Sequence, residues 1–334
     1  MSERLSPQEL QARFEQRVIP DYIEPQRGGA GVSAPPRFVS VGGQPGAGKG
    51  GVLADMQRQI PGAVVVNGDE LRQFHPDYEV LMREDPLRMP NVTSQASGQW
   101  VGKANEYLRE QGSSAVVETT LRDAGMLRRE FEAFKAAGYE TELRVVAVPL
   151  EVSRAATVSR YVEQVRDFGA GRWTPSRAHD EAAANVRETV RELAASDAVD
   201  RVAVQNRDGL VFYDSRGAAG VERAAAALQA VDEARDVRNL SPAQAQSWIV
   251  TTADALHERY RIGNDQTLSE HARRVHNDVD LVKVSKRLAA VDARAVVPLA
   301  FPGDKAAQNK ALADLSEAAK VTLSDRFDVR PRRE

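Results

Sequence analysis

The sequence predicts an α/β fold in which helices flank a parallel sheet, followed by an all-helical C-terminal appendage. Between residues 37 and 205, short apolar runs rich in β-branched residues alternate with longer helical patterns, which is typical of a buried parallel sheet. Beyond residue 217 the chain becomes Ala-rich, with leucines at helical spacing. A glycine-rich segment directly after the first apolar run indicates a P-loop kinase-like sheet, because such a loop between strand and helix binds phosphate.

The first part of the chain is expected to begin with a helix and then form the sheet. An amphipathic helix is expected over residues 5–23, with Ser6 as its N-cap and Pro7 in its first turn. Residues 28–36 have the composition of a linker. Parallel strands are expected at the apolar runs 37–42, 63–66, 115–117, 143–148 and 202–204. Residues 210–213 follow an Asp-Gly turn and are expected to pair with the last of these runs as a hairpin.

Two helices and a helical region complete the expected order. Residues 151–166 have a helical pattern, and Thr174-Pro175 is expected to begin a second helix that reaches about residue 195. The Ala-rich part is expected to hold about four helices, with breaks at 241–242, 263–265 and 301–304. With 334 residues the chain has room for one large domain and an appendage. We therefore expect a P-loop domain over 1–217, which includes the N-terminal helix, and a helical region over 218–334.

The glycine-rich segment matches the phosphate-binding pattern G-x-x-x-x-G-K from Gly43 to Lys49. Its glycines let backbone N–H groups turn toward phosphate oxygens, and the lysine reaches the outer phosphates as a point charge. A flexible turn is the alternative, and the strand before and amphipathic segment after the loop disfavour it. The residues expected to bind nucleotide are Gly43, Gln44, Pro45, Gly46, Ala47, Gly48, Lys49 and Gly50. Gly50 stands where a serine or threonine hydroxyl normally holds Mg²⁺, so the mode of metal binding stays open.

Two carboxylates follow apolar runs at the carboxyl edge of the expected sheet, where ligands bind. Asp69 can accept the proton of an attacking hydroxyl, and its alternative role is the N-cap of a helix over 70–74. Glu118 ends the third run, where burial of a charge is costly unless the charge binds something. Glu118 is therefore a candidate ligand of Mg²⁺ or a group that orients the substrate.

Four further residues carry weaker signals. His75 is a base or a hydrogen-bonding anchor of its loop, and the anchor is favoured because Asp69 already provides a base. Arg160 and Arg172 are candidates to neutralise the charge of a transferring phosphoryl group, although arginines in such a chain are more commonly solvated. Trp173 is either a packing residue or a contact for a base or sugar ring.

Composition excludes several classes of function. The chain has no cysteine, which rules out disulfides, thiolate catalysis and cysteine-bound zinc. A formal net charge of −3 offers no bulk attraction to nucleic acid or an anionic membrane, and neither is expected as a partner. The first residues lack an apolar signal segment and no run approaches the length of a membrane span. A soluble cytoplasmic protein is expected.

Several segments, in their order and spacing, resemble the zeta-toxin family. They are residues 42–49 (GGQPGAGK), 67–78 (NGDELRQFHPDY), 116–122 (VVETTLR), 138–142 (GYETE), 146–149 (VAVP), 172–180 (RWTPSRAHD) and 205–209 (QNRDG). The P-loop is generic, whereas HPDY after NGD and TPxxAHD are specific to this family. The resemblance covers about residues 5–216 and does not extend to the helical region.

The resemblance implies a toxin kinase that uses ATP and Mg²⁺ to phosphorylate a hydroxyl of UDP-N-acetylglucosamine. It implies that Lys49 binds the ATP phosphates, that Asp69 is the general base, and that Arg160 and Arg172 stabilise the transferring phosphoryl group. The residues expected on the side of the sugar nucleotide are Glu118, Thr120, Arg122 and His75. Family members are usually held inactive by a small helical antitoxin. The region 218–334 is expected to be either a built-in inhibitor or a stabilising appendage.

Departures from the family pattern fall mostly on the acceptor side. The helix before the third strand carries Gln99, Trp100 and Gly102 where relatives can place an acidic contact, and the next helix carries Glu130 where a hydroxyl contact is sometimes found. Two alternatives therefore stay open. One keeps the kinase chemistry with another nucleotide or small-metabolite acceptor, and the other is a catalytically impaired nucleotide-binding module whose helical region binds a partner protein.

Overall fold

The structure is a computed structural model that describes residues 4–27, 35–86, 88–264 and 279–320. It divides into two compact units, each described here by itself. Unit 1 comprises the described residues of 1–153 and 177–236, and unit 2 those of 154–176 and 237–334. Most of the expected linker, residues 28–34, lies outside the described residues.

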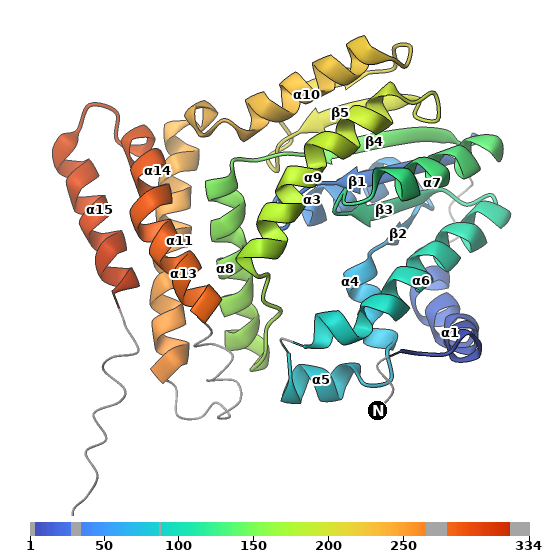
Figure 1. The fold of residues 1–334 in the computed structure, drawn as a ribbon, viewed down its shortest axis with the longest axis horizontal. Helices are drawn as coiled ribbons and strands as arrows, with labels where there is room; N and C mark the ends of the chain where they lie inside the picture. Colours follow the sequence, from blue (N-terminus) through green and yellow to red (C-terminus); the bar gives the residue numbers. More distant parts are fainter. Residues whose placement is uncertain (1–3, 28–34, 87, 265–278, 321–334) are drawn as a thin grey trace, which may run out of the picture. The chain divides into compact units, whose positions relative to one another are not determined.

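Unit 1 is built on the expected sheet of five parallel strands, with a sixth antiparallel strand at one edge (Figure 1). The strand order is β2-β3-β1-β4-β5-β6. The strands are β1 (Arg37–Gly42), β2 (Val64–Val66), β3 (Ala115–Thr119), β4 (Glu140–Val146), β5 (Arg201–Gln205) and β6 (Val211–Ser215). β3 reaches further than the expected run and includes Glu118, and β6 forms the expected hairpin with β5.

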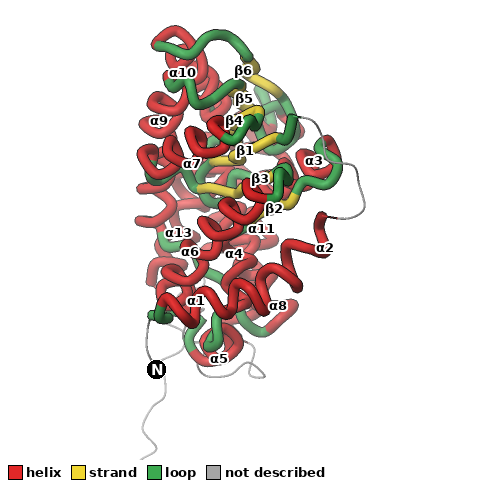
Figure 2. Tube along the Cα trace, turned by 90° about the vertical axis from the view of Figure 1, so that its right-hand side faces the viewer, coloured by secondary structure: helices red, strands yellow, loops and turns green. Residues whose placement is uncertain are grey.

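Two hydrophobic layers cover the sheet, as the continuous apolar runs require. On one face, Val39, Val41 and Val116 pack against α3 (Lys49–Gln59). On the other face lie α7 (Ala124–Ala136) and α9 (Ser176–Ala195), which share a core with Phe38 and its neighbours (Figure 2). Apart from the N-terminal helix described next, the remaining helices wholly in unit 1 are α4 (Gly68–Leu71), η2 (Arg72–Phe74), α5 (Tyr78–Glu84), α6 (Met89–Glu110) and α10 (Val221–Arg235).

The N-terminal helix is confirmed, and it is longer than expected. It runs through α1 (Pro7–Arg13), the wide turns of η1 (Phe14–Ile23) and α2 (Glu24–Arg27), and a capping box between Ser6 and Glu9 begins it. The side-chain amide of Gln26 accepts from the N–H of Val65 at 3.0 Å and donates to its carbonyl at 3.1 Å. Gln26 thereby pairs with the edge strand β2 as a neighbouring strand would, and it covers an edge that is otherwise prone to association.

Unit 2 combines most of α8 (Leu150–Phe168), the loop after it and the C-terminal helices. These helices are η3 (Val237–Asn239), α11 (Pro242–Asn264), α13 (Val279–Arg287), η4 (Leu288–Asp292), α14 (Ala293–Ala300) and α15 (Lys305–Ala319). α11, α14 and α15 pack against one another around Leu256, Leu288 and Leu315, which are fully buried. Among the described residues, every helix is too short or too polar to cross a lipid bilayer.

The boundary between the two units differs from the one expected at residue 217. α10 packs against β5 and β6, so the sheet unit continues to Asp236. Residues 154–176 group with the C-terminal helices, and a buried ion pair shows why. Arg154 on α8 donates two hydrogen bonds, of 2.8 and 2.9 Å, to Asp292 at the end of η4. In the described part of the chain after residue 217, α10, α11, the continuous α13–η4–α14 and α15 agree with the expected helical pattern, while residues 265–278, which include the end of the expected break at 263–265, lie outside the described residues.

Candidate active site

The loop between β1 and α3 folds around the ammonium group of Lys49. Gly46 and Gly48 have φ angles of 77° and 94°, which residues with side chains rarely adopt. A Cβ atom at Gly43 would lie 2.3 Å from the carbonyl oxygen of Val146 on β4, so only glycine fits there. The Nζ of Lys49 donates to the carbonyls of Gly43 (3.0 Å) and Gln44 (3.3 Å). The strand, glycine turn and helix therefore follow one another as the sequence pattern predicts, with the N-terminus of α3 at the end of the loop, and phosphate binding by this loop stays a prediction.

A carboxylate lies beside this lysine. The Nζ of Lys49 is 3.4 Å from Oε1 of Glu118, and both side chains are largely buried. The sheet register explains the proximity, because Val41 on β1 is opposite Glu118 on β3 just before the P-loop begins. The structure therefore joins two residues that are 69 positions apart in the sequence into one charged pair at the carboxyl edge of the sheet.

Asp69 lies at the same edge, in the first turn of α4 after β2. The N-cap of α4 is Asn67, whose Oδ1 accepts the N–H of Asp69 at 3.0 Å, so the alternative role of Asp69 as an N-cap is wrong. Nε of Arg72 donates to Oδ1 of Asp69 at 3.1 Å. Arg72 is itself held by the carbonyl of Pro90 and the hydroxyl of Thr93, both at 2.7 Å. This leaves Asp69 oriented and 38% exposed, as a group that exchanges protons with a substrate must be.

The N-terminal helix supports the turn that carries Asp69. The hydroxyl of Tyr22 accepts the N–H of Asn67 at 3.1 Å and donates to Oε2 of Glu70 at 3.0 Å. Burial, with the charge of Glu70 as a smaller cause, raises the pKa of Tyr22 well above its usual value, so it stays a neutral donor. The sequence offered no sign of this contact, because a tyrosine in an amphipathic helix is ordinarily a packing residue.

The turn after β3 carries two of the four residues expected on the side of the sugar nucleotide. Leu121 has a φ of 53°, the sole positive value for a residue other than glycine in the described part of the chain. Its N–H is held by Oγ1 of Thr119 (3.1 Å) and its carbonyl by Oγ1 of Thr189 (2.8 Å). Such backbone strain is concentrated at functional sites. Thr120 is partly exposed and Arg122 is exposed on either side of it, and their contact with substrate stays a prediction.

Two other residues of the acceptor side have structural partners. His75 is buried, and its Nδ1 accepts the N–H of Asp77 at 3.1 Å, which is the loop-anchor arrangement. Burial lowers its pKa, so it is neutral near pH 7. Glu130 on α7 lies 4.0 Å from the guanidinium of Arg109 and accepts from Asn105 on α6, and burial raises its pKa. Glu130 therefore joins two helices.

Two arginines that were not predicted as site residues donate hydrogen bonds to residues of the P-loop. Arg207, in the turn after β5, donates to the carbonyl of Gly46, and burial lowers its pKa. Arg235, at the end of α10, donates to Oε1 of Gln44 at 2.8 Å, and burial lowers its pKa to about 10. The segment QNRDG contains Arg207 and gave a signal for it. No pattern in the helical sequence around Arg235 distinguishes it from solvent-exposed arginines.

Arg160 and Arg172 belong to unit 2. Nη2 of Arg160 donates to Oγ1 of Thr174 at 3.0 Å, and the backbone N–H of Arg172 donates to Oε1 of Gln164 at 2.9 Å. Trp173 is buried with its ring edge-on to Tyr161, at 5.6 Å between centroids, which is the packing role. The structure thus brings Lys49, Asp69 and Glu118 to one edge of unit 1 and sets the two arginines on one helix and loop of unit 2.

A Ser-His-Asp row elsewhere in unit 1, with a buried serine and histidine and an exposed aspartate, has the distances of a nucleophilic triad. Oγ of Ser153 is 2.9 Å from Nε2 of His179, whose Nδ1 is 3.1 Å from Oδ1 of Asp180. Ser153 is fully buried and also donates to the carbonyl of Leu150. Since a substrate cannot reach its hydroxyl, the row ties the start of α8 to α9 and has no place in catalysis.

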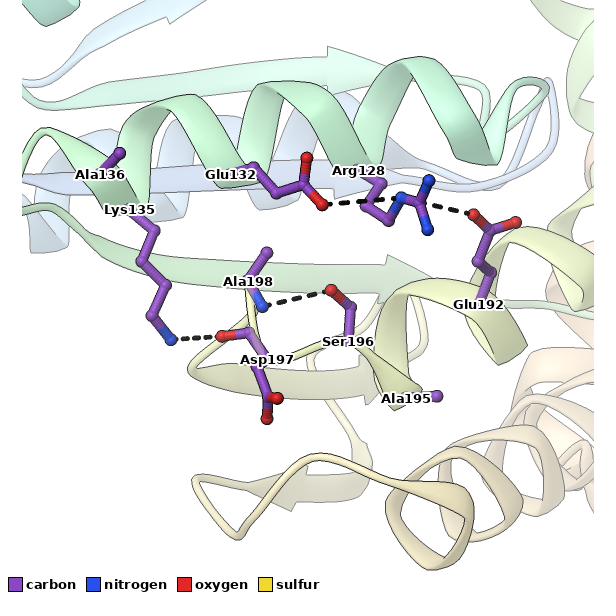
Figure 3. A pocket seen from close by; sticks show the side chains of 9 residues that line it. All are labelled: Arg128, Glu132, Lys135, Ala136, Glu192, Ala195, Ser196, Asp197 and Ala198. Carbon is purple, nitrogen blue, oxygen red and sulfur yellow. Dashed lines mark hydrogen bonds and ion pairs between the residues drawn. The ribbon is translucent and has the colours of Figure 1, made fainter.

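A depression of about 680 Å³ lies at the other edge of the sheet (Figure 3). It is lined by the C-terminal parts of α7 and α9, which lead into the amino ends of β4 and β5. Glu132 and Glu192 both point toward Arg128, at 3.7 and 3.9 Å (Figure 3). Arg128 is therefore already paired with two carboxylates, and ligands of parallel sheets bind at the opposite edge. Among the described residues, no three histidine, aspartate or glutamate side chains converge as a ready-made metal site.

Known proteins resemble the part of the chain that holds this site. The sequence model of the family described as "Zeta toxin" matches residues 31–218. "Toxin zeta" of Enterococcus hirae is 28% identical over 206 residues, covering 61% of this chain and 72% of the relative. "Toxin PezT" of Streptococcus pneumoniae serotype 4 is 28% identical over 186 residues, covering 55% and 74%. A solved structure from the PezAT chromosomal toxin–antitoxin system of S. pneumoniae has a TM-score of 0.64 and 22% identity, and it covers 76% of this chain and 99% of that one.

Proposed function

Because this chain belongs to the zeta toxin family, we propose that it is an ATP-dependent kinase acting on a hydroxyl of UDP-N-acetylglucosamine. One observation carries the kinase assignment. Lys49 and Glu118 form a pair 3.4 Å apart at the P-loop. Asp69 follows β2, the strand beside β3, and so lies at the same carboxyl edge of the sheet. A phosphate-binding cation and an exposed carboxylate at one edge of a sheet are what transfer to a hydroxyl requires.

The proposed reaction needs a base and positive charge around the moving group. The acceptor hydroxyl oxygen attacks the γ-phosphorus, the bond to the β,γ-bridging oxygen breaks, and the hydroxyl proton passes to Asp69. The glycine cradle and Lys49 fit the triphosphate, because each supplies N–H donors to anionic oxygens. Arg160 and Arg172 take the role that the family resemblance implies and neutralise charge on the transferring group. Arg72 orients Asp69.

The chain fits a magnesium ion held mainly by the nucleotide. An ideal Cβ at Gly50 meets no atom within 4 Å, so the position of the usual hydroxyl is open space. Glu118 is the carboxylate that would hold Mg²⁺, directly or through water, together with phosphate oxygens. The bound ion would offset the negative charge of the β- and γ-phosphates. Because Lys49 already pairs with Glu118, a bound metal would share this carboxylate with the lysine.

The family resemblance and the turn after β3 support the proposed acceptor. Thr120 and Arg122 stand exposed or partly exposed on that turn, where a hydroxyl and a guanidinium suit the hydroxyls and diphosphate of a nucleotide sugar. We also infer that the chain is a toxin whose partner is a separate antitoxin. PezT, a relative over the catalytic part, comes from a toxin–antitoxin system, which supports this inference.

Direct assay tests the proposed function. Purified protein, ATP and Mg²⁺ are mixed with UDP-N-acetylglucosamine, and in parallel with a small-metabolite extract, and products are examined by mass spectrometry. We expect one added phosphate on the nucleotide sugar. A different phosphorylated metabolite would keep the kinase and replace the acceptor. Nucleotide binding without any phosphorylated product would favour the nucleotide-binding interaction module.

Substitution of Gly50 tests how the metal is held. Gly50→Ser places a hydroxyl in the open space beside Lys49, so the Mg²⁺ concentration for half-maximal activity should fall several-fold. Serine is also a better helix former than glycine by roughly 0.5 kcal/mol, so the fold should tolerate it. A Mg²⁺ titration of initial rates measures the change, with Gly51→Ser, one residue further along α3 and also in open space, as the matched control. An identical titration for wild type and Gly50→Ser would show that the metal lies elsewhere.

A further inference from the structure

The C-terminal helices hold the loop that carries Arg172. This loop, the α8–α9 loop, comprises residues 169–175 between the end of α8 and the start of α9. Oδ2 of Asp280, in the first turn of α13, accepts from Nε1 of Trp173 at 3.3 Å and from the backbone N–H of Ser176 at 2.7 Å. Oδ1 of Asp280 accepts from the hydroxyl of Ser176 at 2.5 Å. The carboxylate of Asp280 therefore accepts three hydrogen bonds, one from Trp173 within the loop and two from Ser176 directly after it.

The other side of the loop is fastened to α8. A Cβ at Gly171 would lie 2.6 Å from the carbonyl oxygen of Tyr161, so the chain lies directly on the helix there. The N–H of Arg172 is held by Gln164, and Thr174 accepts from Arg160. A loop held along α8 and bound at its far end to α13 has little freedom to move the backbone from which the Arg172 side chain extends.

α8 is in turn bound to the same group of helices. Arg154, less than two helical turns before Arg160, pairs with Asp292 at two atoms, and both side chains are more than nine-tenths buried. Trp173 is buried against Tyr161 on α8, and its hydrogen bond to Asp280 links this packed pair to α13. All these contacts lie within unit 2, which explains why residues 154–176 group with residues 237–334.

We propose that the C-terminal helical region is a scaffold that positions the phosphoryl-binding arginines, with Asp280 as the positioning residue for the α8–α9 loop. This inference rests on the proposed function, because it takes Arg160 and Arg172 as the groups that neutralise the transferring phosphate. It assigns the helical region a part in the reaction, in place of a built-in inhibitor or an appendage that only stabilises. A charged group held in its reactive geometry before the substrate arrives costs no reorganisation at the moment of transfer.

The test removes the carboxylate of Asp280 and follows both the loop and the reaction. In Asp280→Ala, hydrogen exchange of the peptide spanning 169–176 should become at least tenfold faster, while exchange in β1 and the P-loop stays unchanged. The kcat for phosphoryl transfer should fall about tenfold or more, with the affinity for ATP within twofold of wild type. Asp280→Asn keeps an oxygen acceptor and should recover part of the kcat. Asp314→Ala, an exposed aspartate of α15, is the matched control and should change neither quantity.

A double-mutant cycle separates positioning from general destabilisation. If Asp280 acts through Arg172, then Asp280→Ala should lower kcat by less than twofold in a chain that already carries Arg172→Ala. Full, multiplicative losses in the double variant would overturn the proposal, as would unchanged exchange of 169–176 in Asp280→Ala. A wild-type protein that transfers no phosphate would instead refute the proposed function, and the hydrogen-exchange comparison would still decide whether Asp280 holds the loop.

Discussion

Replacing Asp69 by asparagine is expected to lower phosphoryl transfer by about 10²–10⁴-fold, the range for loss of a general base. Asparagine has the same shape and keeps an oxygen that can accept from Nε of Arg72, so the turn after β2 should be preserved. It cannot accept the proton of the acceptor hydroxyl. The affinity for ATP should be unchanged, because the P-loop and Lys49 are untouched. Steady-state rates and a nucleotide titration of Asp69→Asn measure the two quantities.

The control for this variant is an exposed carboxylate on α3. Asp55→Asn removes a negative charge whose partner, Arg58, is on the surface, and it should leave the rate within twofold of wild type. Turnover of Asp69→Asn within tenfold of wild type would sink the assignment of the base. Loss of both turnover and ATP binding would show that the turn had collapsed and that Asp69 is a structural residue.

Replacing Asp292 by alanine is expected to destabilise unit 2 by about 3–5 kcal/mol, because it leaves a buried guanidinium without its carboxylate. Asp292 is 1% exposed and Arg154 is 7% exposed, so water cannot take the place of the lost partner. The same carboxylate also lies 3.8 Å from Nε of Arg287. Urea unfolding followed by tryptophan fluorescence measures the change, since Trp173 and Trp248 are in unit 2.

The matched control replaces both members of the pair. Arg154→Met with Asp292→Leu removes the two charges together, and such replacements of a buried pair are often neutral or stabilising. We therefore expect the double variant to unfold at a higher urea concentration than Asp292→Ala alone. A loss below about 1 kcal/mol in Asp292→Ala would contradict the structure, because a pair worth so little is typical of an exposed position.

Much of the fold and part of the site were predictable because they depend on local patterns. Apolar runs flanked by helical periodicity placed the strands, since a strand buried on both faces must be continuously hydrophobic. The P-loop could be located from its glycines, because Gly46 and Gly48 have positive φ angles that the local turn requires. The carboxyl ends of the runs then indicated Asp69 and Glu118. The N-cap alternative for Asp69 failed because Asn67, two residues earlier, competes for the same helix end.

The sequence by itself determined which candidate residues lie at the carboxyl edge of the sheet, because strand ends and glycine turns are set by neighbours along the chain. Only the tertiary structure decided which distant side chains support these residues. The pairing of Glu118 with Lys49 follows from strand register, and the contacts of Arg235 with Gln44 and of Asp280 with Trp173 join residues more than 100 positions apart. Hydrophobic periodicity does not predict such contacts. It identifies the apolar face of a helix but does not specify the partner of a polar residue beside that face.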